Sequence, residues 1–287
     1  MKKTIIIFSL MAALLLSSCS SKASSANSSK LKVLVSINPL KEITEKIGGD
    51  KVEIDTIISP GLEVHDYQLT ANDIIKLNSA NLFIYNGLNL ESFKDKLLSS
   101  SDNKNLYSVD ASKGVSQIKT ADGTDPHIWI SPTCSKIIAG NIKDALIKND
   151  SRNKAYYDKN YNEFIKSIDL LYNKYKPLFS GLNKKSFVTG HAAFAYFCRD
   201  FNLTQKSVED VFASGEPSAK KLADLTDYCR SNGIKTIFVE DLVSPKVSET
   251  LAKEVDAKTV KINTFLDGDD YAGTQEDNLK KIYESLK

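Results

Sequence analysis

Apolar residues recur along this chain with two alternating spacings, one typical of strands and the other of helices. Residues 31–35 form a strand-like run, and apolar residues in 40–47 follow it at helical spacing. The same order returns in the second half, where a strand-like run at 186–189 precedes a helix-like stretch at 194–201. Strands that alternate with helices favour parallel sheets covered by helices. We therefore predict an α/β fold, with further strands at 52–58, 82–85, 234–240 and 258–262 and further helices at 218–232 and 245–255.

The longest helical pattern lies in the middle of the chain. From Ser151 to Phe179 there is no glycine and a single proline, Pro177, and large apolar or aromatic residues recur every three or four positions. This pattern predicts one helix of about 25 residues, twice the usual length. Because it stands between two sets of strand–helix units, we interpret it as a connector. The predicted organisation is an N-terminal α/β lobe at 31–149, a linking helix at 150–180 and a C-terminal α/β lobe at 181–287.

The first residues have the form of an export signal. Lys2 and Lys3 precede an apolar run at 5–16, which is too short to cross about 30 Å of hydrocarbon. The run ends in Leu-Ser-Ser-Cys19, which resembles the cleavage and lipidation site of bacterial lipoproteins. We predict a lipoprotein signal peptide at 1–18 and a lipidated Cys19; a signal peptide with a chance cysteine is the alternative.

Residues 19–30 would then be a tether. Apart from its lysines, the stretch 20–30 contains only Ser, Ala and Asn, which cannot bury enough apolar area to fold. A lipid anchor followed by such a tether predicts a protein held on the extracytoplasmic face of the cell membrane.

The charge of the mature chain is balanced. Loss of residues 1–18 removes Lys2 and Lys3 from 38 basic residues and none of the 36 acidic ones, which leaves equal numbers. We find no long basic run, so nucleic acid is not an expected partner. After Cys19 an odd number of cysteines remains, which excludes a complete disulfide framework. Cys198 and Cys229 could pair, or both could be buried free thiols.

The chain contains three histidines, His65, His127 and His191, each in a short loop-like motif after a strand-like or polar stretch. Neutral imidazole is the commonest protein ligand for zinc. Ligands of open α/β sheets bind beyond the carboxyl ends of the strands. The histidines are too far apart for a local motif, so the fold would have to assemble them in a cleft between the lobes. We predict one metal site.

Three imidazoles leave a tetrahedral Zn²⁺ one ligand short. Asp267, in the acidic loop 266–270, is the expected fourth ligand, and a solvated acidic turn is the alternative for it and for Asp269 and Asp270. Ligating imidazoles usually donate their second ring N–H to an acceptor. Candidates for this role are Asp66, Asp125 and Glu240.

Five stretches of the chain resemble the cluster A-I solute-binding proteins, the metal-binding lipoproteins of bacterial ABC transporters for zinc and manganese. They are HDYQLTAND at 65–73, NGLNLE at 86–91, DPHIW at 125–129, GHAAFAYF at 190–197 and IFVE at 237–240. The resemblance implies two lobes of parallel sheet with flanking helices, joined by one long rigid helix. It also implies that the protein is a monomer and not an enzyme. Its expected role is to bind one metal ion in the interlobe cleft and pass it to an ABC permease. His65, His127 and His191 match the family's ligands, and its fourth position falls near Asp267.

Zinc is the expected metal and manganese the alternative. Three imidazoles suit Zn²⁺, whereas oxygen-rich sites suit Mn²⁺, and the family's manganese members typically carry a carboxylate where this chain has His191. A tethered zinc hydrolase, with water in the fourth position and Glu63 or Glu240 as general base, is a less favoured alternative, as is surface adhesion. Because ligating imidazoles must be neutral, metal affinity is expected to fall below about pH 6.5.

Overall fold

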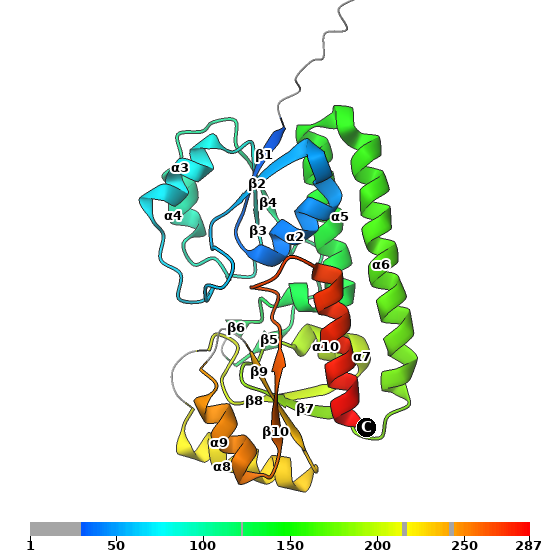
Figure 1. Ribbon diagram of the computed structural model, residues 1–287. Coiled ribbons are helices and arrows are strands. Elements are labelled where there is room, and N and C mark those ends of the chain that lie inside the picture. Colours follow the sequence, from blue (N-terminus) through cyan, green and yellow to red (C-terminus); the bar gives the residue numbers. More distant parts are fainter. Residues whose placement is uncertain (1–29, 122, 214–216, 241–243) are drawn as a thin grey trace, which may run out of the picture.

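Two four-stranded parallel sheets, one in each half of the chain, form the framework of the protein (Figure 1). The computed structural model describes residues 30–121, 123–213, 217–240 and 244–287. The first sheet has the strand order β2-β1-β3-β4, and all its neighbouring strands are parallel. Its strands are β1 (Leu31–Val35), β2 (Val52–Thr56), β3 (Leu82–Tyr85) and β4 (Tyr107–Asp110).

Four helices surround this first sheet, and their starts follow from local sequence. Pro39 lies in the first turn of one helix, Thr70 and Asp73 form a capping box at the next, and the Ser131 side chain accepts the Cys134 N–H at a third. The helices are α2 (Asn38–Gly48), α3 (Ala71–Ser79), α4 (Lys94–Ser99) and α5 (Pro132–Asn149). Shorter pieces are the 3₁₀ turns η1 (Gly49–Lys51) and η2 (Ile128–Ile130) and the hairpin β5 (Lys119–Thr120)–β6 (Gly123–Thr124).

The second sheet repeats the design, with the order β10-β9-β7-β8 and only parallel pairs. Its strands are β7 (Ser186–Thr189), β8 (Thr204–Ser207), β9 (Thr236–Glu240) and β10 (Lys258–Ile262), and its helices are α7 (Ala195–Phe201), α8 (Ala219–Ser231), α9 (Lys246–Glu254) and α10 (Tyr271–Leu286). The sequence pattern does not predict β8. Its residues, Thr-Gln-Lys-Ser, are all polar because the strand lies at the edge of the sheet with no fully buried position.

The predicted long helix is present as α6 (Lys154–Ser180), which has 27 residues and follows the 3₁₀ turn η3 (Ser151–Asn153). It runs along both halves of the molecule (Figure 1). Tyr157, Phe164 and Ile168 are buried on one of its faces, with Tyr175 and Phe179 nearer its end. Pro177 lies in the last turn, so the main-chain hydrogen bond that it cannot donate is missing only close to the end of the helix. The predicted fold class, two parallel sheets with flanking helices joined by a long helix, is confirmed.

One apolar core runs through both halves. The same cluster of buried side chains contains Val35 of β1, Ile138 of α5, Phe164 of α6, Phe187 of β7 and Ile282 of α10. A second, smaller cluster fills the other face of the second sheet, under α8 and α9. The two sheets therefore share a common core along α6 instead of packing as separate units.

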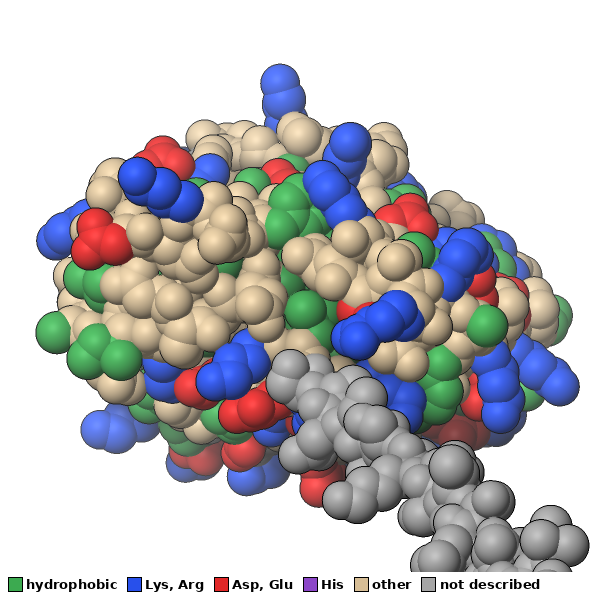
Figure 2. All heavy atoms as spheres, turned by 90° about the horizontal axis from the view of Figure 1, so that it is seen from above, with side chains coloured by type: hydrophobic (Ala, Val, Ile, Leu, Met, Phe, Trp, Pro, Cys, Tyr) green, Lys and Arg blue, Asp and Glu red, His purple; other side chains and the backbone are tan. Residues whose placement is uncertain are grey.

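The predicted signal peptide, Cys19 and most of the tether lie outside the described residues. Within the described ranges, no helix is both long enough and apolar enough to cross a membrane. On the face shown in Figure 2, basic and acidic side chains are interspersed. Cys134, Cys198 and Cys229 are buried free thiols, so the Cys198–Cys229 pairing is not formed.

Candidate metal centre

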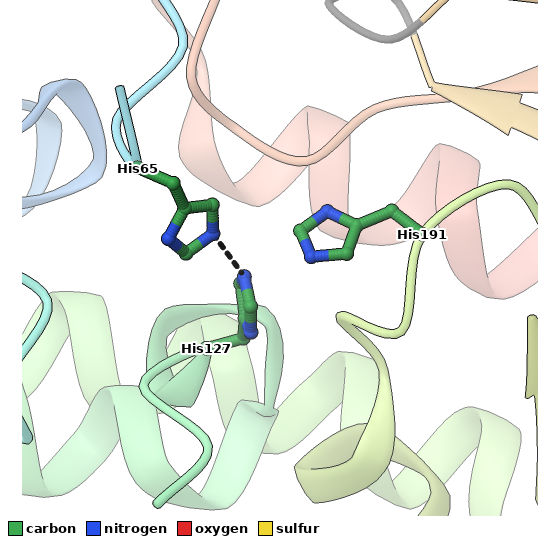
Figure 3. A group of neighbouring side chains, drawn as sticks. All are labelled: His65, His127 and His191. Atoms are coloured by element: carbon green, nitrogen blue, oxygen red, sulfur yellow. Dashed lines mark hydrogen bonds between the residues drawn. The ribbon is translucent and has the colours of Figure 1, made fainter. Parts of the chain in front are cut away.

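The three histidines come together at one point (Figure 3). One ligand atom from each of His65, His127 and His191 lies within 4.8 Å of the others. The closest pair is Nε2 of His65 and Nε2 of His127, which are 3.3 Å apart. The closest pair already has the spacing of two ligands of one ion, since Zn–N bonds of about 2.0–2.1 Å place two ligand nitrogens some 3–3.5 Å apart. A more widely separated pair of nitrogens must draw together to bind the same ion.

The carboxyl ends of the strands place these side chains. His65 lies in the loop that follows β2, and His127 immediately precedes η2. His191 stands two residues after β7, in the second sheet. The site is thus shared between the two halves of the molecule, where sequence reasoning expected it.

The ring of His127 is oriented by Asp125. The Asp125 carboxylate is fully buried, and its Oδ1 accepts from the main-chain N–H of His127 at 2.9 Å and lies 2.8 Å from Nδ1 of the same residue. A proton held on Nδ1 leaves the lone pair of Nε2 for a metal. The turn is braced by Asn86, whose side-chain N–H donates to the Pro126 carbonyl at 3.0 Å.

Loss of this carboxylate should weaken metal binding. Asp125→Ala removes the acceptor that fixes the tautomer of His127, and such changes typically cost 10- to 100-fold in affinity. We expect a zinc dissociation constant about 10 to 100 times higher, measured by competition with a fluorescent chelator. Asp125→Asn keeps an acceptor oxygen and should lose less. Equal losses in both variants would contradict the orienting role.

Glu240 acts on His191 through the main chain and not on its ring. Glu240 Oε1 accepts the His191 N–H at 3.1 Å, and burial raises the pKa of Glu240 to about 8. A Cβ atom on Gly190 would lie only 2.5 Å from Glu240 Oε2, so this contact requires a glycine. Nε2 of the His191 ring instead lies 2.9 Å from the main-chain oxygen of Val211.

The segment 209–213, which follows β8, belongs to the site and was missed by sequence reasoning. Besides the Val211 oxygen, it contributes Phe212, whose ring meets the His65 ring edge-on with centroids 5.7 Å apart. A main-chain oxygen and a phenyl ring carry no recognisable metal-binding pattern. The preceding strand β8 was itself invisible in the sequence, so no signal pointed to this segment.

The remaining predicted carboxylates do not join the three rings. Asp66 and Asp267 are both exposed, and neither belongs to the cluster of possible ligand atoms found among the described residues. The loop of Asp267 is nevertheless close to that of His65, since the Leu266 oxygen accepts the Gly61 N–H at 3.0 Å.

Burial keeps two of the rings neutral. Desolvation, together with the smaller effects of the neighbouring His127 and His191, lowers the pKa of His65 to about 3. Desolvation, followed by the His127 ring, also lowers the pKa of His191 to about 3. Neutral imidazoles carry the lone pairs that a metal needs, so these two rings are ready to bind at neutral pH.

These pKa values change the expected pH dependence of zinc binding. Three solvated imidazoles with a pKa near 6.5 would lose about a thousandfold in affinity between pH 7.5 and 5.5. A lowered pKa keeps the ring unprotonated down to that lower value, so protons compete with zinc at His65 and His191 only as the pH approaches 3. We therefore expect a loss far smaller than a thousandfold by pH 5.5, in a competition titration at both pH values. A thousandfold loss would show that the rings are solvated before zinc binds.

Comparison with known proteins decides the family. Residues 33–285 match the family described as ZnuA, zinc-uptake complex component A, periplasmic. The chain belongs to this family. The ZnuA match covers both sheets, the long helix and all three histidines, so it concerns the whole described protein.

Individual known proteins are similar to this one over most of the chain. The high-affinity zinc uptake system protein ZnuA of Bacillus subtilis is 33% identical over 271 residues, which cover 88% of this chain and 85% of that protein. The laminin-binding protein of Streptococcus agalactiae, described as an adhesin with metal-transporting activity, superposes with a TM-score of 0.85 at 28% identity, covering 90% and 100% of the two chains. A manganese-bound mutant of a periplasmic metal-binding protein from Candidatus Liberibacter asiaticus gives 0.83 at 27% identity, with the same coverage.

The carboxylates considered as bases of a hydrolase are otherwise engaged. Glu240 is buried against the main chain of His191. Glu63 Oε1 accepts the main-chain N–H groups of Val64 and His65, at 2.8 and 3.2 Å. This arrangement agrees with the ZnuA family, whose members are binding proteins and not enzymes.

Proposed function

We propose that this protein is the extracytoplasmic receptor that captures Zn²⁺ between its lobes and delivers it to an ABC permease for import. The observation that carries this proposal is the group of three histidine rings, two from the first half and one from the second, within 4.8 Å of one another. Membership of the zinc-uptake family supports the same function.

Zinc is favoured over manganese by the donor set. Imidazole nitrogen suits Zn²⁺, and Mn²⁺ prefers carboxylate, carbonyl and water oxygen. No carboxylate of the described residues joins the three rings. The B. subtilis relative is named for zinc uptake, although a manganese-bound member of similar fold also exists.

Asp267 is our proposed fourth ligand, reached by an inward movement of its loop when the metal binds. The support for this is the contact between Leu266 and Gly61, which ties that loop to the loop of His65. Asp267→Ala should then weaken zinc binding by about tenfold or more. Asp269→Ala, on the same exposed loop, is the matched control and should leave the affinity unchanged. Equal affinities in both variants would remove Asp267 from the ligand set and leave the fourth position to water.

The setting of the receptor is also a proposal. Lipidation at Cys19 would anchor the protein to the outer face of the cell membrane, and residues 20–30 would let a monomer reach its permease. Lipoprotein names among relatives support the anchor.

Metal analysis of the purified protein tests the function directly. After loading with equal zinc and manganese and removal of loosely bound ions, we expect close to one zinc per chain and little manganese. Cells that lack the protein should lose uptake of zinc at low external concentration and regain it on complementation. A protein that retains manganese in preference would be the manganese receptor, and one that retains neither metal would not be a metal receptor.

A further inference from the structure

The His191 ring already has a partner in this structure. Its Nε2 lies 2.9 Å from the main-chain oxygen of Val211, and both residues are buried. A carbonyl oxygen can only accept a hydrogen bond, so Nε2 must carry the ring proton and donate it. Nδ1 of the neutral ring is then the unprotonated nitrogen.

Nε2 of His191, which bonds to Val211, also faces the metal centre. His65 and His127 approach each other through their Nε2 atoms, and Asp125 occupies the other ring nitrogen of His127. Figure 3 shows the His191 nitrogen that is remote from its Cβ, which is Nε2, on the side of the ring turned towards His127. The three Nε2 atoms are therefore the natural set of donors.

A proton and a metal ion cannot share this nitrogen, because both use the same lone pair. Binding of Zn²⁺ through Nε2 requires the proton to leave it. The ring stays neutral if water carries that proton to Nδ1, and no net proton is released. The donor to Val211 then no longer exists, and its buried carbonyl oxygen is left without a partner.

We propose that the hydrogen bond between His191 and Val211 is a latch that zinc breaks, and that segment 209–213 is released as the metal binds. This inference rests on the proposed function, since it needs a metal ion at the three histidines. A buried carbonyl that loses its donor is unfavourable, so the segment moves until the Val211 oxygen reaches water.

The conformation and the partial burial of segment 209–213 favour its movement when the hydrogen bond to His191 is lost. Ala213 has a φ of +49°, a left-handed conformation that costs energy for a residue other than glycine. Apart from Val211, the residues of the segment are only partly buried. The Phe212 ring touches His65 of the first lobe, so a movement of the segment reaches both lobes. The loaded and empty receptors would thereby differ at their surface, which is the difference that a permease has to recognise.

Two other arrangements would keep the segment in place. His191 could bind zinc through Nδ1 while Nε2 continues to donate to Val211, which would then orient the ring. Alternatively, the Val211 oxygen could itself bind the metal. Both arrangements hold or tighten segment 209–213, so the response of this segment to zinc separates them from the latch.

Hydrogen exchange of the intact protein, with one equivalent of zinc or with a chelator, tests the proposal. The reporting amides are those of Glu209, which donates to the Gly190 oxygen at 2.7 Å, and Ala192, which donates to the Asp210 oxygen at 3.5 Å, because these two bonds join the segment to the loop of His191. We expect zinc to speed their exchange by about 2- to 10-fold, as loss of one hydrogen bond would. The amides of β7 are the internal control and should not become faster. The His127→Ala variant, treated in the same way, should show no acceleration.

A nitrogen NMR measurement of His191 gives the second readout. The latch predicts a proton on Nε2 without metal and a proton on Nδ1 with zinc. Slower or unchanged exchange of the Glu209 and Ala192 amides, or a proton retained on Nε2 in the zinc complex, would overturn the latch while leaving the receptor function intact. Failure of native mass spectrometry to detect bound zinc would overturn the proposed function and the latch together.

Discussion

Replacement of His191 by alanine is expected to weaken zinc binding by more than about a hundredfold. Loss of a residue that only orients a ligand already costs 10- to 100-fold, and His191 supplies a ligand atom itself. It is also the single histidine contributed by the second sheet. Two nitrogen donors from the first half would remain, and the metal would no longer be held between the lobes.

The measurement is a competition titration against a chelator of known affinity, with parent and variant at pH 7.5. Thermal unfolding in excess chelator is the control for folding, because His191 is buried and its removal leaves a small cavity. A variant that melts near the parent without metal but binds zinc a hundred times more weakly supports the ligand role. Retention of parental affinity would exclude His191 from the site, whatever the effect on melting.

Trp129→Ala is expected to lower the free energy of unfolding by about 3–5 kcal/mol, the usual cost of removing a buried aromatic side chain. Trp129 is fully buried, and its ring lies 5.2 Å from that of His127. Its Nε1–H donates to the Thr264 oxygen at 2.8 Å, and its own main-chain oxygen accepts from Tyr271. The residue therefore joins the first half of the chain to the segment between β10 and α10.

Urea unfolding of the metal-free protein measures this effect. Trp129→Phe is the matched variant, since it keeps most of the apolar volume but leaves the Thr264 oxygen without its donor, at a cost of about 1–3 kcal/mol. We expect the order parent, phenylalanine variant, alanine variant. A loss below about 1 kcal/mol in the alanine variant would show that the tryptophan does not support the junction.

The spacing of apolar residues in the sequence was sufficient to predict those strands and helices whose buried side chains recur at a regular interval. The strand at 31–35 and the helix around 151–179 were predicted because their apolar residues repeat at spacings of two or of three to four, and both are present as β1 and α6. The edge strand β8 could not be predicted, since a strand with no fully buried position has no such repeat. The three histidines were predicted to meet because each follows a strand-like or polar stretch at the same edge of its sheet.

The second layer of the site was harder to predict. Asp125 was recognisable because it is two residues from His127. The contact between His191 and Val211 joins positions on either side of β8 and involves a main-chain oxygen, which every residue possesses. Glu240 was predicted to accept from the ring of a ligating histidine, but it accepts from the main chain of His191, and this attachment depends on the close approach of β9 to Gly190. Such contacts are set by the packing of strands and leave no trace in local sequence.

The core that is continuous along α6 has a mechanical consequence. Rotating the two halves of the molecule widely apart, as a hinge would, must separate side chains of β1, α5, β7 and α10 that belong to one apolar cluster. Each Å² of apolar surface exposed in this way costs about 25 cal/mol, so a large rotation is opposed by the whole length of the long helix. The frame stays stiff, and small local displacements near the histidines are the inexpensive motions. If the protein delivers its ion to a permease, as proposed, the energy that extracts a tightly held ion is then not stored in the receptor as a large rotation of its halves and has to come from the transporter.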